Sequence, residues 1–217
     1  EIVKQKDGLL ISGWHFTETE NGFIYEDKLG KINLPLPGLI GPHQISNASL
    51  AIATLRHQNE FDISETDYVK GIVNVKWPAR MQNITASPYG KKLAKGSTLW
   101  LDGGHNPAAS KVIAESFKGE KLVLICGMME NKDTAGYLAT LAPQTEHLYG
   151  IHVEGEASHS ATDIVKHAWS QNIKAETAKN VEEAIEKIGT KTPATIVICG
   201  SLYLAGQVLA DNGLIPE

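Results

Sequence analysis

The spacing of apolar residues predicts antiparallel strands followed by two helices in the first part of the chain. Short apolar runs are separated by turn residues, among them an Asn-Gly pair at 21–22 that is typical of a hairpin. The runs expected to form strands are LLISGWHF (9–16), GFIYED (22–27) and KINLPL (31–36). Apolar positions at helical spacing then predict a helix over 44–58. Ser64, with Asp67 three residues later, approximates a capping box and predicts a second helix that ends before residue 77.

From about residue 83 the chain alternates strand-like apolar runs with helical stretches. Strands are expected near 83–87, 98–101, 121–126, 146–153, 174–176 and 194–199. Helices are expected at 107–118, 132–141, 160–171, 180–188 and 202–211. Parallel strands need such crossovers, and continuous apolar runs indicate strands that are covered on both faces. We therefore predict an α/β fold, in which a doubly wound, Rossmann-like, mostly parallel sheet over 83–217 follows a partial α+β segment over 1–82.

The composition is that of a globular protein with no electrostatic footprint for nucleic acid or anionic lipid. Hydrophobic residues make up 42% of the 217, the formal net charge is −5, and Lys and Arg form no run. No apolar segment approaches the ~20 residues that a membrane helix needs, and residues 1–15 lack a signal-peptide pattern. We expect a cytoplasmic monomer that binds neither nucleic acid nor membrane. Because the chain opens at Glu1 without an initiator Met, we also expect it to be a piece of a longer protein.

The two cysteines indicate structure rather than redox chemistry. Cys126 and Cys199 each end an apolar run immediately before a glycine, in LVLICG and TIVICG. Free cysteine is among the most buried residue types, and disulfides are rare inside cells. We predict two buried, reduced thiols on equivalent parallel strands.

The segment LDGGHNP (101–107) is the most informative candidate site. Asp102 and His105 follow an apolar run, and Pro107 suits the first position of a helix. Open α/β sheets bind ligands at the carboxyl ends of their strands, and the two glycines allow the backbone to approach a substrate closely. An Asp-Gly turn with Asn106 as a helix cap requires no function. We favour the cap for Asn106 and a ligand site for Asp102 and His105.

Two upstream motifs add weaker signals. In GPHQISNAS (41–49), His43 and Asn47 lie four residues apart on one predicted helix face. An amide offers both a donor and an acceptor, which suits the edge of a purine, although an exposed polar face has the same pattern. Arg80 ends WPAR (77–80), where a guanidinium can clamp phosphate oxygens with two parallel bonds. A surface arginine after a proline has that pattern too.

Taken in order, GxHQxxNA, WPxR, LDGxHNP and GSLYLAG closely resemble the carboxyl-terminal half of the folylpolyglutamate synthases and bifunctional dihydrofolate synthases of the Mur ligase superfamily. The resemblance covers essentially the whole chain, and the motifs are specific jointly rather than singly. His43 with Gln44, and the LDG before His105, resemble the folate enzymes more than the cell-wall Mur ligases.

This resemblance implies an ATP-dependent amide ligase with Mg²⁺ as a cofactor. In the family, ATP phosphorylates a substrate carboxylate, and the amine of L-glutamate attacks the acyl phosphate. The carboxylate belongs to dihydropteroate or a reduced folate. By similarity, Asn47 would contact adenine, Arg80 the phosphates and Asp102 the ribose, while His105 would lie near the phosphate or glutamate as a catalytic residue. Convergence of these anchors in a cleft between the two segments is expected.

Other polar positions remain open between a function and a structural role. Ser201 in GSLYLAG is a weaker candidate for the glutamate side, and a helix N-cap is at least as good an interpretation. Lys132 and Asp133 fit a family position but are interpreted first as loop residues. His152, Glu154, Glu156 and His159 gather in the 152–160 segment, where we favour an acidic loop over a metal site because the spacing is poor. We predict no metal site in this chain.

The largest departure from the family is that no GxxxxGK[ST] phosphate-binding loop occurs in the 217 residues. We expect that loop and the magnesium ligands in a preceding segment, and therefore expect these residues alone to be inactive. Three other functions were weighed. A nicotinamide-dependent oxidoreductase would need GxGxxG, which DGGHNP does not provide. Metal-dependent hydrolysis at Asp102 and His105 would need more ligands. A non-catalytic module that binds a small molecule or a partner protein remains the alternative, as does another Mur-type ligase.

Overall fold

The structure is a computed structural model that describes residues 4–6, 9–41 and 43–214. The chain divides into two compact units, Glu1–Trp77 and Pro78–Glu217, here called unit 1 and unit 2. Unit 2 begins at Pro78, whereas the sequence placed the boundary between residues 82 and 83. No helix within the described ranges is long and apolar enough to cross a lipid bilayer.

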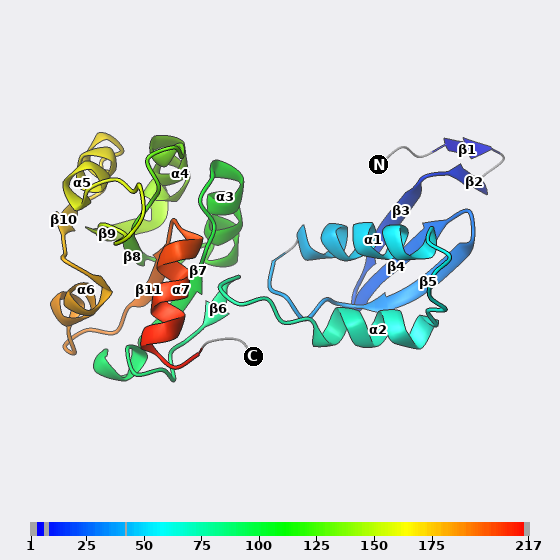
Figure 1. The fold of residues 1–217 in the computed structure, drawn as a ribbon, viewed down its shortest axis with the longest axis horizontal. Helices are drawn as coiled ribbons and strands as arrows, with labels where there is room; N and C mark the ends of the chain where they lie inside the picture. Colours follow the sequence, from blue (N-terminus) through cyan, green and yellow to red (C-terminus); the bar gives the residue numbers. More distant parts are fainter. Residues whose placement is uncertain (1–3, 7–8, 42, 215–217) are drawn as a thin grey trace. The chain divides into compact units, whose positions relative to one another are not determined.

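Unit 1 contains antiparallel strands and two helices (Figure 1). Strands β1 (Lys4–Lys6) and β2 (Leu9–Ser12) form a pair, while β3 (Trp14–Thr19), β4 (Gly22–Asp27) and β5 (Gly30–Pro35) form a three-stranded sheet in that order. The helices are α1 (His43–Arg56) and α2 (Glu65–Asn74). The predicted hairpin is confirmed, but its turn is formed by residues 20–21, because Gly22 already pairs with Thr19. The capping box of Ser64 with Asp67 is also confirmed.

The prediction of one continuous strand over 9–16 was wrong, because two strands, β2 and β3, occupy this run. The run 9–16 is divided by Gly13, which has a φ of 82° and therefore leaves the extended conformation. The second piece, β3, continues to Thr19 because its partner β4 pairs with it over six registered residue pairs from Trp14↔Asp27 to Thr19↔Gly22.

A buried ion pair joins the sheet of unit 1 to α1. The Arg56 Nε donates to Asp27 Oδ2 at 2.8 Å and its Nη2 donates to Oδ1 at 3.0 Å. The Tyr25 hydroxyl also donates to Asp27 Oδ2, at 3.1 Å. Asp27 is 3% exposed, so its charge depends on these partners rather than on water. The pair thereby fixes the last turn of α1 over the β4–β5 turn.

Unit 2 is a doubly wound sheet with strand order β10-β9-β8-β11-β7-β6 (Figure 1). The strands are β6 (Gln82–Asn83), β7 (Thr98–Asp102), β8 (Leu122–Cys126), β9 (Thr145–Gly150), β10 (Ala175–Thr177) and β11 (Thr195–Cys199). All neighbours are parallel except β6, which pairs antiparallel with β7. The helices are α3 (Pro107–Ser116), α4 (Thr134–Leu141), α5 (Ala161–Ser170), α6 (Val181–Ile188) and α7 (Leu202–Asp211). The predicted fold class is confirmed.

Two apolar clusters cover the opposite faces of this sheet. Ile113 of α3, Leu138 of α4 and Ile164 of α5 pack with Leu124 and Val197. On the other face α6 and α7 pack with alternate residues of the same strands; this cluster includes Leu99, Leu101, Ile125, Ile196, Ile198, Ala184, Ile185, Leu204 and Val208. The continuous apolar runs in the sequence therefore reflect strands buried on both sides. Cys126 and Cys199 lie in register on adjacent strands, free and buried, as predicted.

The strand predicted at 83–87 was wrong, because β6 covers only Gln82–Asn83. Ile84 still donates its N–H to the Leu99 carbonyl, but the next bond to β7 comes from a side chain: the Leu99 N–H donates to Thr85 Oγ1. The backbone then turns, and Ser87 donates its N–H back to the Ile84 carbonyl.

Two large aliphatic residues of α1, one buried and one exposed, provide a matched test of the packing in unit 1. Ile52 is 2% exposed and Leu50 is 57% exposed on the same helix. We expect Ile52→Ala to lower the free energy of unfolding by about 2–5 kcal/mol, because it removes buried methyl groups and leaves a cavity. Leu50→Ala should change it by less than about 0.5 kcal/mol. Urea titration followed by circular dichroism measures both, and equal losses would contradict the burial of this helix face.

Candidate functional site

The central strands of unit 2 end together at one edge of the sheet. Strand β7 leads through Asp102 into α3, and the adjacent β11 leads through Gly200 and Ser201 into α7. Because α3 and α7 pack on opposite faces of the sheet, the chain leaves these two neighbouring strands in opposite directions. Such a switch point creates the crevice in which open α/β sheets bind ligands. The predicted placement of LDGGHNP at a strand end is therefore confirmed.

Glycines allow the three strand exits to pack backbone against backbone. The Gly200 N–H donates to the Gly104 carbonyl at 3.2 Å, and the Gly127 N–H donates to the Cys199 carbonyl at 3.3 Å. Gly200 has a φ of 104°, and a Cβ there would stand 2.7 Å from the Gly127 oxygen. A side chain at Gly200 would separate the exits, so glycine is required there.

Asp102 is a buried carboxylate that holds two segments of backbone. It is 5% exposed, and its Oδ2 accepts the Met81 N–H at 2.9 Å while its Oδ1 accepts the Gly104 N–H at 2.7 Å. The Gly103 N–H adds a bond to the Ala79 carbonyl at 2.8 Å. These contacts bring the WPAR segment and the LDGG turn together, although they are more than twenty residues apart in sequence.

Arg80 is half-buried at the centre of a strained bend. Its neighbours Ala79 and Met81 have φ values of 56° and 44°, and each is 3% exposed. Left-handed conformations are costly for residues with a Cβ, so the surrounding contacts must maintain them. Sequence reasoning missed this bend, because neither alanine nor methionine signals a positive φ.

His105 and Asn106 complete the exit from β7. The half-buried His105 ring has its Nδ1 3.1 Å from the Gly103 carbonyl, so an N–H at Nδ1 leaves Nε2 as an acceptor. Asn106 is the N-cap of α3, with its Oδ1 accepting the Ala109 N–H at 2.9 Å, and Pro107 follows at the first position. The predicted cap is confirmed.

Ser201 lies beside this turn but has a structural role of its own. It is 2% exposed, and its Oγ accepts the N–H groups of Tyr203 at 3.1 Å and Leu204 at 3.4 Å as the N-cap of α7. Of the two interpretations left open, the cap is observed. A contact with glutamate stays a prediction.

Asn47 lies in unit 1, so its predicted convergence with Arg80 and Asp102 stays a prediction. It is exposed on the first turns of α1, and its Nδ2 donates to Gln44 Oε1 at 3.1 Å. The Gln44 Nε2 in turn lies 3.0 Å from His43 Nε2. The motif GPHQISN therefore forms a string of side-chain hydrogen bonds that ends at an exposed amide.

The polar segment 152–160 is tied to its neighbours rather than built around an ion. His152 Nδ1 lies 2.8 Å from Ser158 Oγ, and Ser158 forms an isolated antiparallel bridge with Met129. Among the residues that the structure describes, no group of three or more His, Cys, Asp or Glu side chains is arranged to hold a metal. Asp133 caps α4 by accepting the Gly136 N–H at 2.9 Å.

The electrostatics of this sheet edge favour an anion. Helices α3, α4 and α7 each follow a parallel strand and so begin at its carboxyl end, where unpaired N–H groups give a partial positive charge. Arg80 adds a full positive charge. Cys126 beneath does not contribute a thiolate, since the neighbouring Cys199 thiol and complete burial raise the pKa of Cys126.

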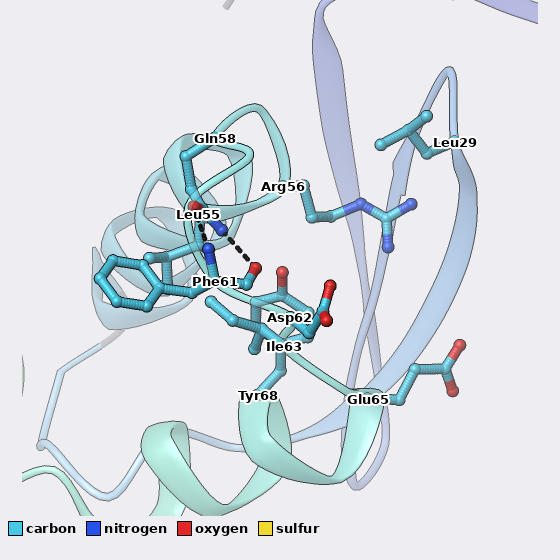
Figure 2. Close-up of a pocket in the computed structure, with 9 residues that line it drawn as sticks. All are labelled: Leu29, Leu55, Arg56, Gln58, Phe61, Asp62, Ile63, Glu65 and Tyr68. Atoms are coloured by element: carbon cyan, nitrogen blue, oxygen red, sulfur yellow. Dashed lines mark hydrogen bonds between the residues drawn. The ribbon is translucent and has the colours of Figure 1, made fainter.

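A separate pocket in unit 1 contains none of the predicted site residues. Figure 2 shows Arg56 extending from α1 toward the β4–β5 turn, where Leu29 lies, with Phe61 and Tyr68 elsewhere in the lining. The bidentate bond of Arg56 to Asp27 gives this arginine a structural partner.

Comparison with known proteins defines the class to which this Rossmann-like unit belongs. Residues 80–202 match the model of the Mur ligase glutamate ligase domain. The chain belongs to the Mur ligase family.

One similar protein and two solved structures are named folylpolyglutamate synthase, dihydrofolate synthase or FolC. Dihydrofolate synthase/folylpolyglutamate synthase of Escherichia coli K12 is 26% identical over 216 residues, which are 95% of this chain and 47% of that protein. The structure of E. coli FolC with DHPP and ADP has a TM-score of 0.73 at 25% identity, covering 91% of this chain and 45% of that one. A bifunctional folylpolyglutamate synthase/dihydrofolate synthase with Mn, AMPPNP and L-glutamate bound has a TM-score of 0.74, again at 25% identity and with the same coverage. The chain spans about half the length of the curated relatives it matches.

A substitution in the LDGG turn should show how tightly the site is packed. A Cβ on Gly104 would stand 2.6 Å from both the Ala109 Cβ and Asp102 Oδ1. We expect Gly104→Ala to lower the free energy of unfolding by about 1–3 kcal/mol through this overpacking. Gly206→Ala is the control, because Gly206 lies inside α7 and an added Cβ would have no other atom within 4 Å. It should stabilise the protein by up to about 1 kcal/mol. A neutral Gly104→Ala variant would contradict the close packing of the turn.

The raised pKa of Cys126 predicts slow thiol chemistry in the folded protein. A raised pKa leaves less thiolate at a given pH, and the thiolate is the reactive species. Because both cysteines are also buried, both thiols should resist a disulfide reagent at pH 8 in buffer and react promptly in denaturant. The sign of the linkage also predicts a loss of stability as the pH rises above the ordinary thiol range, because the unfolded chain releases the proton first. Rapid modification of the native protein would contradict the buried register of β8 and β11.

Proposed function

We propose that this chain is the carboxyl-terminal portion of an ATP-dependent ligase of the folylpolyglutamate synthase/dihydrofolate synthase type. The enzyme joins L-glutamate to a carboxylate of dihydropteroate or a reduced folate. Membership of the Mur ligase family supports the reaction class, and the relatives named for these two activities support the substrates. A structural relative that binds AMPPNP and L-glutamate supports the two small-molecule partners.

One observation carries this proposal: the hydrogen-bonded junction of the Ala79–Met81 bend with the Asp102–Gly103 turn. It places Arg80 next to the carboxyl end of β7, where the helix N-termini already favour an anion. In the ligation, the γ-phosphoryl group passes to the substrate carboxylate and ADP leaves. The amine of glutamate then attacks the acyl phosphate, loses a proton and displaces phosphate. Both steps depend more on positioning and charge neutralisation than on covalent help from the protein.

Each candidate residue has a role in this scheme. Arg80 binds the phosphates, and Asp102 binds the ribose. Asn47 presents its exposed amide to the adenine. His105 acts near the transferred phosphoryl group or the incoming amine, where its Nε2 is available as an acceptor when Nδ1 bonds Gly103. Ser201 is the glutamate-side candidate.

The divalent cation has no assigned ligands in this chain. The described residues contain no three-residue cluster of metal-binding side chains, and one structural relative was solved with Mn. We propose that Mg²⁺ enters with the nucleotide and is held by a segment that also carries the phosphate-binding loop. For that reason the 217 residues by themselves should bind nucleotide weakly and should not turn over.

The proposal is tested by nucleotide binding to the 217-residue chain. Isothermal titration with ATP should give weak, saturable binding, and Arg80→Ala should weaken it by about tenfold or more, since charge-assisted phosphate contacts are worth roughly 1.5–3 kcal/mol. Lys118→Ala, an exposed cation just after α3, is the control and should leave the affinity unchanged.

Turnover is measured in the same preparation. ADP release with ATP, Mg²⁺, L-glutamate and dihydropteroate should stay at background. An affinity insensitive to Arg80→Ala would overturn the nucleotide site, and robust ADP release would overturn the proposed inactivity of these residues alone.

A further inference from the structure

The bend around Arg80 is maintained largely by contacts from outside itself. Ala79 and Met81 both have a left-handed backbone conformation, which L-amino acids rarely adopt, and both are 3% exposed. Arg80 lies between them. A bend of this kind relaxes unless other groups hold it. The hydrogen bonds to this bend therefore determine the backbone position from which the Arg80 side chain extends.

Three hydrogen bonds hold the bend, and two of them come from the LDGG turn. The Ala79 N–H donates to Gln82 Oε1 at 2.8 Å, within the same segment. The Gly103 N–H donates to the Ala79 carbonyl, and the Met81 N–H donates to Asp102 Oδ2 at 2.9 Å. The second Asp102 oxygen accepts the Gly104 N–H, so one carboxylate bridges the bend and the turn. Charge-assisted bonds of this kind are roughly twice as strong as neutral ones.

We infer that Asp102 is a positioning residue that acts through Arg80, by holding Met81 in its left-handed conformation. This inference rests on the proposed function, in which Arg80 binds polyphosphate. Asp102 is 5% exposed and directs both oxygens at backbone N–H groups, an arrangement suited to orienting the chain. The ribose contact that the resemblance implies for Asp102 cannot affect a ligand that has no ribose, so the two roles can be separated.

Inorganic tripolyphosphate separates them because it has no ribose. We expect Asp102→Ala to weaken the binding of tripolyphosphate by a factor on the order of tenfold, and that of ATP by at least as much because ATP also loses the ribose contact. Loss of a negative charge near a polyanion would by itself tighten tripolyphosphate binding, so weaker binding indicates that Arg80 is misplaced. The double variant with Arg80→Ala should bind tripolyphosphate no more weakly than Arg80→Ala alone.

Asp211→Ala is the control. It removes a carboxylate at the C-terminal end of α7, where Asp211 accepts the Tyr89 hydroxyl at 2.8 Å, without touching the bend. It should not weaken either ligand. If Asp102→Ala weakens ATP binding alone, or if its effect on tripolyphosphate binding adds to that of Arg80→Ala, the positioning role is overturned.

Amide hydrogen exchange tests the positioning without any ligand. In Asp102→Ala the Met81 amide should exchange at least tenfold faster relative to Val197 in the sheet core, and the Arg80 amide resonance should shift. Asp102→Asn is the second variant, because one amide oxygen and one NH₂ cannot accept both N–H groups and the side-chain volume is kept. Unchanged Met81 protection and Arg80 shifts in a folded variant would overturn the inference. If wild-type chain binds neither ligand while Met81 responds as expected, the proposed nucleotide site fails and the positioning of Arg80 stands.

Discussion

The Asp102 carboxylate joins two backbone segments just beyond the end of the short β6–β7 ladder. One oxygen holds the bend before β6 and the other holds the turn after β7, and both lie at the edge where the parallel strands end. A buried carboxylate needs such donors, because in their absence its desolvation would go uncompensated. The need for donors and the need for a fixed bend are met by the same contacts. The arrangement of the candidate site follows from that single group.

The glycine exits and the helix N-termini act together with this carboxylate. Gly104, Gly127 and Gly200 let the exits of β7, β8 and β11 approach until their backbones share hydrogen bonds. Close approach gathers the first turns of three helices at one edge, and their N–H groups supply positive potential there. The ligation that we propose would use such an edge, because the transferred charge has to be stabilised while it moves.

Unit 1 shows the same principle in a different role. Its buried carboxylate, Asp27, is satisfied by Arg56 and by the Tyr25 hydroxyl, and the result is a fixed junction between a hairpin and a helix. Asp27 is held mainly by a guanidinium, whereas Asp102 accepts hydrogen bonds from the backbone N–H groups of Met81 and Gly104.

The sequence by itself determined the order of elements, the doubly wound class, the caps at Ser64 and Asn106 and the equivalence of the two cysteine strands. Each of these depends on local periodicity or on hydrogen bonds within a few residues, so the pattern carries the information. The positions of Arg80, Asp102, His105 and Ser201 as candidates came from motif resemblance, and their roles remain proposals. Only the tertiary structure decided that Asp102 bonds Met81, that Ala79 and Met81 are left-handed, and that Gly200 meets Gly104. These depend on segments far apart in the chain, where burial and backbone geometry outweigh local propensity and leave no signal in the residues themselves.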